Sequence, residues 1–336
     1  MKDGALKTVC LEDGNVRLSA LNLGAITQGI WVAGGGAARS GPSIQGRDVP
    51  IVLGYQDPEA YCHDANYLGA IAGRIANRTA NSSFLLDGQM FSLSANEAKT
   101  HLHGGLGGLS KRIWDMDLDT AGRRVELRYM SPDGEEGYPG TANLRVEIAL
   151  SDSRVVYTME ASVDRPTPIN LAQHNYYNLQ GTGQIWNHRL QLSADRYTPV
   201  DADMIPTGAI ESVDGTRLDY RTEAPLTDYD PQHVGTDINF VVNKAHNHPV
   251  ATVRADNGLV LRMWSDQPAL QFYTGTHLRA AADAHGKQSI APFGGLCLEP
   301  QGFPNAMNEP SFPSIVATPE VPYRQVLTLE ICQEAL

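Results

Sequence analysis

The stretch Arg124-Val125-Glu126-Leu127-Arg128-Tyr129 alternates polar and apolar residues with a period of two. Successive side chains of a β-strand point to opposite faces, so this pattern predicts a strand with one buried face. The alternation returns at Asn143–Ile148 and at Arg189–Leu192, and Val155–Met159 is a more continuous apolar run of β-forming residues. The chain is therefore expected to be rich in short strands.

Turn signals separate these runs, and helical periodicity is nearly absent. The turn signals are Asp87-Gly88, Pro132-Asp133-Gly134, Asp214-Gly215 and Asn257-Gly258. The best candidate for a short helix is Asp57–Asn66, and the 32 glycines and 20 prolines fit many turns. Sheets packed on sheets are the expected result, which means an all-β sandwich or barrel. No linker divides residues 1–336, so we predict a single domain. The stretch Gly34–Asp48 starts with three glycines and is expected to be a surface loop.

The composition narrows the class of protein. Hydrophobic residues make up 42% of the 336 residues and charged residues 19%, as in soluble globular proteins. The net charge of -12 argues against a nucleic-acid partner and fits a small neutral ligand. No apolar run approaches membrane-spanning length, and the first residues lack a signal-peptide pattern. The four scattered cysteines suggest reduced thiols in a cytoplasmic protein.

One carboxylate stands at the end of an apolar run, in Leu296–Pro304. On a strand, Leu296 and Leu298 would face a core, while Cys297, Glu299 and Gln301 would share the opposite face. Pro300 lacks an N–H for a sheet ladder, so the strand is expected to be an edge or to end there. Glu299 is then a candidate catalytic base, and the alternative is a solvated glutamate on a strand edge.

Two histidines, His101 and His103, would share a strand face just before Gly104-Gly105. A His-x-His pair can bind a metal, but one imidazole can also be buried and hydrogen-bonded while the other lines a pocket. We favour the pocket, because a metal needs further ligands that the sequence does not place. The glycines that follow lack the phosphate-loop pattern.

Other segments combine polar side chains that suit a polar ligand. His174 lies among amides and aromatics in Asn170–Leu179, which indicates either a sugar site or an internal hydrogen-bond network. Gly73–Arg78 supplies two arginines, of which one could pair in the core and one could contact a ligand. Gly235–Phe240 contributes Asp237, and Gln267–Gly275 reads as a strand with Gln271 and Tyr273 on one face.

Together and in this order, these segments resemble the galactose mutarotase (aldose 1-epimerase) family. The resemblance runs from about Val52 to about Arg324. The motifs that carry it are Gly73-Arg74-Ile75-Ala76-Asn77-Arg78, Leu102-His103-Gly104-Gly105, Asn170–Leu179, Ile205-Pro206-Thr207-Gly208, and Leu298–Pro304 with Asn308.

The resemblance implies a large antiparallel β-sandwich with a sugar cleft on one sheet face and no metal or organic cofactor. It implies an isomerase acting on a small neutral monosaccharide, as a monomer or homodimer. Glu299 occupies the position of the general base and His174 that of the general acid. A second active-site histidine corresponds to His103. The implied sugar-binding residues are Asn77, Arg78, Asp237 and Gln271.

The chain departs from the family pattern at three places. The family usually has Ser-Tyr-Phe after the acid histidine, where this chain has Asn175-Tyr176-Tyr177. Threonine is common where Pro300 stands, and Gly34–Asp48 looks longer than usual. The candidate catalytic groups are retained, so these departures bear on which sugar is preferred.

Three other functions are open to the same residues. A metal-dependent sugar isomerase would use His101, His103, His174 and Glu299 as ligands. A non-catalytic sugar-binding module could share the scaffold, because a fold does not fix a function. A glycoside hydrolase would need two carboxylates flanking one bond, and Asp237 would have to join Glu299.

Overall fold

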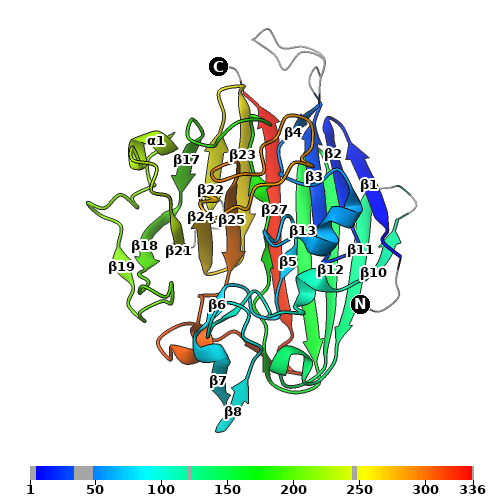
Figure 1. Ribbon diagram of the computed structural model, residues 1–336, viewed down its shortest axis with the longest axis vertical. Helices are drawn as coiled ribbons and strands as arrows, with labels where there is room; N and C mark the ends of the chain where they lie inside the picture. Colours follow the sequence, from blue (N-terminus) through cyan, green and yellow to red (C-terminus); the bar gives the residue numbers. More distant parts are fainter. Residues whose placement is uncertain (1–4, 34–47, 120, 122, 244–247, 335–336) are drawn as a thin grey trace.

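The computed structural model describes residues 5–33, 48–119, 121, 123–243 and 248–334. The largest sheet in this part of the chain has nine strands (Figure 1). In spatial order they are β10 (Asp115–Leu118), β11 (Arg124–Ser131), β12 (Ala142–Ser151), β13 (Arg154–Val163), β27 (Tyr323–Gln333), β23 (Leu259–Ser265), β22 (Ala251–Arg254), β17 (Arg189–Leu192) and β20 (Ala224–Pro225).

Two smaller sheets pack on the nine-stranded sheet through one hydrophobic core. The six-stranded sheet has the order β16 (Tyr176–Tyr177), β25 (Leu296–Gln301), β24 (Ala269–Tyr273), β21 (Asp237–Val242), β18 (Ala194–Thr198) and β19 (Glu211–Ser212). The four-stranded sheet consists of β1 (Thr8–Asp13), β2 (Val16–Leu21), β3 (Ile26–Val32) and β4 (Val49–Pro50). Leu127 and Val146 of the large sheet share this core with Leu18 of the four-stranded sheet and Leu298 of the six-stranded one.

Four two-stranded ladders complete the strands. They are β5 (Ile71–Ala72) with β15 (Ala172–Gln173), β6 (Arg78–Thr79) with β9 (His101–Leu102), β7 (Ser83–Leu86) with β8 (Gln89–Ser92), and β14 (Thr167–Pro168) with β26 (Val316–Ala317). All the ladders between these named strands are antiparallel. The expected antiparallel β-sandwich is therefore confirmed.

Helices are short in the described residues. The α-helix α1 spans Leu226–Tyr229, and the 3-10 helices are η1 (Pro58–His63), η2 (Ala80–Ser82), η3 (Leu109–Lys111), η4 (Glu135–Gly137) and η5 (Ala306–Asn308). The helix predicted at Asp57–Asn66 exists as η1, with Asp57 as its N-cap accepting a hydrogen bond from the Glu59 N–H. None of the helices in these residues is long and apolar enough to cross a membrane.

The predicted strands and turns are found where the alternation placed them. Arg124–Tyr129 lies in β11 and Asn143–Ile148 in β12. Their aliphatic members are buried and Tyr129 is partly buried. Asp87-Gly88 connects β7 to β8, and both residues have positive φ, as the tight hairpin turn requires. Of the long loop expected at Gly34–Asp48, residues 34–47 lie outside the described residues.

Candidate active site

The strand β25 carries Glu299 in its second half, where it pairs with β24 of the six-stranded sheet. Leu296 and Leu298 are buried in the main core, and Glu299 points to the other side with 2% of its surface exposed. Across the ladder, Glu299 faces Gln271 on β24, and Gln271 faces Asn239 on β21. This face of the sheet therefore presents a row of polar side chains. A solvated glutamate on a strand edge, the alternative considered from the sequence, is excluded.

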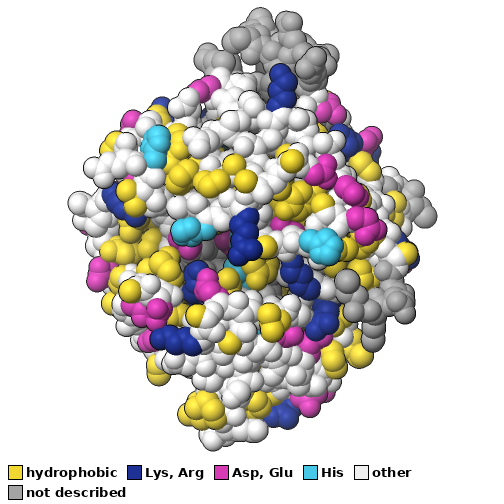
Figure 2. All heavy atoms as spheres, in the orientation of Figure 1, with side chains coloured by type: hydrophobic (Ala, Val, Ile, Leu, Met, Phe, Trp, Pro, Cys, Tyr) yellow, Lys and Arg dark blue, Asp and Glu magenta, His cyan; other side chains and the backbone are white. Residues whose placement is uncertain are grey.

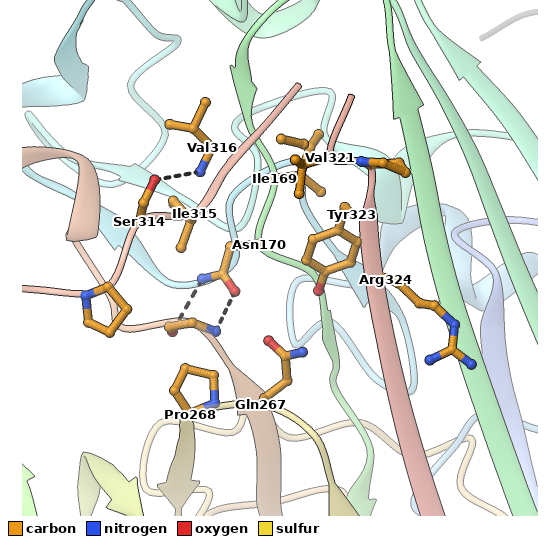
Figure 3. Close-up of a pocket in the computed structure, with 14 residues that line it drawn as sticks. Ile169, Asn170, Gln267, Pro268, Ser314, Ile315, Val316, Val321, Tyr323 and Arg324 are labelled. Atoms are coloured by element: carbon orange, nitrogen blue, oxygen red, sulfur yellow. Dashed lines mark hydrogen bonds between the residues drawn. The ribbon is translucent and has the colours of Figure 1, made fainter. Parts of the chain in front are cut away.

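The end of β25 is held by side chains from outside its own sheet. The neighbouring strand β16 pairs only with Leu296 and Cys297, so Pro300 lies beyond that ladder, as its missing N–H requires. Asn170 accepts a hydrogen bond from the Gly302 N–H at 2.7 Å and donates one to the Gly302 carbonyl at 3.3 Å. Figure 3 shows the Asn170 amide directed at this backbone, with Tyr323 nearby. Gln325 donates to the Pro300 carbonyl at 2.8 Å. These contacts fix the backbone on the C-terminal side of Glu299.

His174 lies between β15 and β16 and is placed by backbone hydrogen bonds to the neighbouring loop. Its N–H donates to the Ala70 carbonyl, and its carbonyl accepts from the Gly69 N–H. The imidazole Nε2 lies 3.7 Å from Glu299 Oε2, and the Nδ1 atom lies 3.6 Å from the Cys297 sulfur. The side chain is almost fully buried, with 4% of the residue surface exposed. The structure thus brings the predicted acid and the predicted base together.

Burial acts in opposite directions on these two groups. It lowers the pKa of His174 to about 4, because the charged imidazolium loses its hydration. It raises the pKa of Glu299 well above the ordinary carboxyl value, and the nearby charge of Asp237 raises it further. Burial therefore favours the uncharged form of each group, which leaves one proton, on the carboxyl group, for the pair.

His103 completes this group from a backbone turn after β9. The Asn77 N–H donates to His103 Nδ1 at 3.2 Å, and the His103 N–H donates to the Asn77 carbonyl. Because Nδ1 accepts, the proton of neutral His103 is on Nε2. The ring lies edge-on to His174 at a centroid distance of 5.1 Å. Burial lowers the pKa of His103 well below its usual value, as do the nearby charges of His174 and Arg78.

Lack of space explains why a glycine, Gly104, follows His103. A Cβ atom on Gly104 would lie 1.7 Å from the Gly73 carbonyl oxygen, and its φ of +91° also disfavours any other residue. The close approach brings the His103 turn against the segment that carries Asn77 and Arg78. The glycines of this motif therefore position the histidine and do not form a phosphate site.

Arg78, Asp237 and Gln271 form a connected polar group beside the histidines. Arg78 binds Glu97 through Nε at 2.6 Å and through a terminal nitrogen at 3.0 Å. Its other terminal nitrogen lies 3.7 Å from Asp237, which accepts a hydrogen bond from Gln271 at 2.5 Å. Burial raises the pKa of Asp237, although the Arg78 charge opposes that change. All seven predicted site residues thus lie in or beside this group.

The contacts of His101 and Arg74 decide between roles that the sequence left open. His101 and His103 do not share a face, because β9 ends at Leu102 and His103 has a φ of +51°. Both ring nitrogens of His101 are hydrogen-bonded, to Ser94 at 2.6 Å and to Tyr138 at 2.5 Å, so the four-ligand metal set is not assembled. The sequence left open which of the two arginines of Gly73–Arg78 pairs in the core. Arg74 is the buried one, and its guanidinium donates to the Ser131 hydroxyl and to four backbone carbonyls.

The departures at Asn175 and Pro300 lie behind the site and not in it. Asn175 is fully buried, accepts a hydrogen bond from Gln173 at 2.8 Å and donates toward Tyr157 and Tyr177. Pro300 alternates with Glu299 and faces the inner side of the sheet. Both residues therefore belong to the network between the sheets that supports the site.

Three residues that contact or extend the group had no role in the prediction from sequence. The Tyr67 ring packs against His103 at a centroid distance of 4.7 Å and stacks on His174 at 6.0 Å. Cys297 contacts His174, and the alternation had placed its side chain on the Glu299 face without assigning it a role. Asn239 extends the polar row, and its place two residues after Asp237 on a strand was the available signal.

The site offers few donors for a metal ion. Within the described residues, one group of three could hold one: His174, Cys297 and Glu299, each with a ligand atom within 4.8 Å of the others. Figure 2 shows acidic, basic and histidine side chains gathered around a hollow in the middle of this face.

The chemical capacity of the site follows from these contacts. It combines a buried carboxylate, two neutral imidazoles, one guanidinium and several amides. A carboxylate and an imidazole that can exchange protons on either side of a bound molecule are suited to general acid–base catalysis. The amides and the guanidinium are suited to hydroxyl groups of a neutral ligand.

Comparison with known proteins identifies the family of this chain. A model of the aldose 1-epimerase family matches residues 7–330. The galactose mutarotase of Bos taurus is 38% identical over 285 residues, which is 83% of each chain. The aldose 1-epimerase of Escherichia coli (strain K12) is 38% identical over 283 residues, or 81% of each chain.

Solved structures show the same architecture. The GalM/aldose epimerase homologue from C. elegans superposes with a TM-score of 0.90 at 24% identity, covering 98% of this chain and 99% of that chain. The galactose 1-epimerase from Lactobacillus acidophilus gives 0.81 at 25% identity, with the same coverage. From the family match across nearly all its length and from these relatives, the chain belongs to the aldose 1-epimerase family of isomerases.

Proposed function

We propose that this protein interconverts the α and β anomers of a free aldose by acid–base ring opening, with Glu299 as base and His174 as acid. The observation that carries the proposal is the approach of His174 Nε2 to Glu299 Oε2, at 3.7 Å, inside a buried group of sugar-compatible side chains. The distance is too long for a strong direct hydrogen bond, so both groups keep capacity for a ligand.

The reaction breaks and re-forms one C–O bond with the help of two proton transfers. Opening the ring removes the proton of the C1 hydroxyl, breaks the bond between C1 and the ring oxygen, and adds a proton to that oxygen, which gives the open-chain aldehyde. Rotation about the C1–C2 bond exposes the other face of the carbonyl, and closure reverses both transfers. Glu299 would accept the C1 hydroxyl proton, and His174 would protonate the ring oxygen. On closure Glu299 would give its proton to the C1 oxygen, and His174 would take its proton back from the hydroxyl that closes the ring.

The single proton shared by the pair suits this cycle. Opening moves one proton from substrate to Glu299 and one from His174 to substrate, so the enzyme keeps the same number of protons throughout. The reactive form has an ionised Glu299 and a protonated His174. Burial disfavours both charges, and a sugar bound between them would separate the pair and supply hydrogen bonds to each.

The surrounding residues have complementary roles in the proposal. Neutral His103 would donate from Nε2 to the ring oxygen and stabilise charge that develops there. Arg78 is held by Glu97 and would direct its remaining donors toward sugar oxygens. Asn77, Asp237 and Gln271 would bind ring hydroxyls, so that the anomeric carbon lies at the acid–base pair.

The substrate is proposed to be a neutral monosaccharide, either galactose or glucose or a pentose. The relatives named galactose mutarotase and aldose 1-epimerase support the reaction class. The carboxylates Glu97 and Asp237 neutralise Arg78, so the described residues of the site leave little net positive charge for a sugar phosphate.

Polarimetry on freshly dissolved α-anomers of galactose, glucose, xylose and arabinose tests the proposal. We expect the wild-type protein to accelerate the approach to anomeric equilibrium for at least one of them. The order of the rates identifies the preferred sugar. No acceleration for any sugar, with binding still detectable by calorimetry, would support a non-catalytic sugar-binding module instead.

A further inference from the structure

The polar row on the six-stranded sheet continues past the seven candidate site residues to Asn239. Asn239 faces Gln271 across the β21–β24 ladder, and only 1% of its surface is exposed. In the part of the chain that the structure describes, Asn239 Oδ1 and Gln271 Oε1 accept no hydrogen bond. Buried acceptors without a partner are uncommon in folded proteins and indicate a missing donor.

Hydrogen bonds to neighbouring groups use the nitrogen of each amide, so the oxygen is the atom left unpaired. Asn239 Nδ2 donates to Thr198 Oγ1 at 3.2 Å, and the Thr198 hydroxyl donates to the backbone carbonyl of Asn239 at 3.4 Å. The threonine thus uses its proton elsewhere and offers the Asn239 side chain only an acceptor. Gln271 Nε2 is likewise committed to Asp237. Both amides therefore present carbonyl oxygens, which require a donor.

These two amides line one small cavity together with predicted sugar-binding residues. Its walls include Asn77, Arg78, Thr198, Asp237, Asn239 and Gln271. Its volume is about 10 Å³, which is roughly the room that one water molecule or one hydroxyl group needs. A second sugar unit would not fit there.

The cavity is separated from Glu299, the proposed base, by a distance that follows from the strand order. Asn239 is two strands away from Glu299 in the sheet, or about 9–10 Å at the usual strand spacing. A pyranose ring with its C1 hydroxyl at Glu299 would place the hydroxyls of its far side toward Asn239.

We propose that Asn239, together with Gln271, forms a subsite that accepts a hydrogen bond from one sugar hydroxyl on the ring side opposite the anomeric carbon, at C3 or C4. This inference rests on the proposed function and adds Asn239 as a specificity-determining residue. The subsite selects a donor, so a fluorine at the same carbon does not satisfy it. It also selects an unsubstituted monosaccharide, because the cavity has no room for a glycosyl group on that hydroxyl.

The test is a substrate–variant cycle measured by polarimetry as kcat/KM above the uncatalysed rate. The substrates are the better of galactose and glucose and its 3-deoxy-3-fluoro and 4-deoxy-4-fluoro derivatives. We expect wild type to lose about 10- to 100-fold on one derivative, since a buried acceptor is then left unpaired. For Asn239→Ala, kcat/KM on the parent sugar is expected to fall by a similar factor. The value on that derivative should then be little lower than on the parent sugar.

A second variant keeps the test valid if Asn239→Ala folds poorly. Thr198→Val removes the anchor of the amide and leaves Asn239 in place, so a smaller loss with the same substrate pattern is expected. Equal losses on the parent and both derivatives in both variants would overturn the subsite, because a structural defect affects all substrates alike. Equal wild-type rates on all three sugars would also overturn it. A wild-type protein that accelerates no sugar would overturn the proposed function as well.

Discussion

His174 is held between two partners, with its Nδ1 atom 3.6 Å from the Cys297 sulfur and its Nε2 atom 3.7 Å from Glu299. Burial raises the pKa of the Cys297 thiol well above its usual value, so the sulfur stays protonated and can act as a weak acceptor. In the proposed cycle Nε2 takes and gives the transferred proton, so neutral His174 must keep its proton on Nδ1, beside the Cys297 sulfur. Cys297 is therefore expected to position the acid by fixing its tautomer.

Replacing this thiol should weaken catalysis without affecting sugar binding. We predict that Cys297→Ala lowers kcat about 2- to 10-fold with little change in KM, because one weak hydrogen bond is lost. Cys297→Ser keeps an acceptor, the hydroxyl oxygen, and should retain more activity. Nitrogen-15 NMR of His174 reads the tautomer directly, with His174→Asn to assign the signal. A wild-type spectrum with the proton of neutral His174 on Nε2 would contradict this account.

The plot of kcat/KM against pH should be bell-shaped. Its two limbs should lie away from the ordinary pKa values of histidine and glutamate. Burial lowers the pKa of His174 to about 4, so the pair takes up a second proton only near that pH and the acid limb lies well below the usual histidine range. The alkaline limb marks loss of the shared proton and lies above the ordinary carboxyl pKa, because burial and Asp237 raise that of Glu299.

One variant checks the assignment of the alkaline limb. Asp237→Asn removes the neighbouring charge, so the pKa of Glu299 falls and the alkaline limb should move to lower pH, in addition to a loss in kcat/KM. An acid limb near the ordinary histidine pKa, or an alkaline limb that Asp237→Asn does not move, would contradict the expected electrostatics. Rates are taken from polarimetry after subtraction of the buffer-catalysed reaction.

The Asn170–Gly302 contact should contribute to both stability and activity. Asn170→Ala leaves the buried Gly302 N–H without its acceptor, so we expect the free energy of unfolding to fall by about 1–3 kcal/mol. The strand end that carries Glu299 also loses a support, and kcat should fall more than KM rises. Urea denaturation and polarimetry measure these effects. The control is Asn143→Ala, at an exposed asparagine on β12, which should change neither. Unchanged kcat in a destabilised Asn170→Ala protein would show that the contact serves stability alone.

Local patterns in the sequence predicted the fold and part of the site. Alternation with a period of two is a property of neighbouring residues, so β11, β12 and the side to which Glu299 points could be read directly. The approach of His174 to Glu299 could not, because it depends on the pairing of β16 with β25, two segments far apart in the chain. The roles of the seven site residues came from the family resemblance and remain predictions.

The missed features share a physical cause. The expected common face of His101 and His103 is wrong because a positive φ at His103 ends the strand, and sequence alternation carries no sign of that turn. Tyr67 also has positive φ and lies in a loop held by Asp64, whose carboxylate accepts from the Asn66 and Leu68 N–H groups. Side chains delivered by irregular backbone leave no periodic signal.

The central claim is that Glu299 and His174 transfer the protons of anomeric interconversion. Polarimetry of Glu299→Gln and His174→Asn, each nearly isosteric, tests it most directly, with Glu330→Gln on the large sheet as a control. We predict that each site variant loses at least about 10²-fold in kcat, the usual contribution of one positioned acid or base, while circular dichroism and sugar binding are retained. The control should keep full activity. Turnover near the wild-type rate in either site variant would contradict the account.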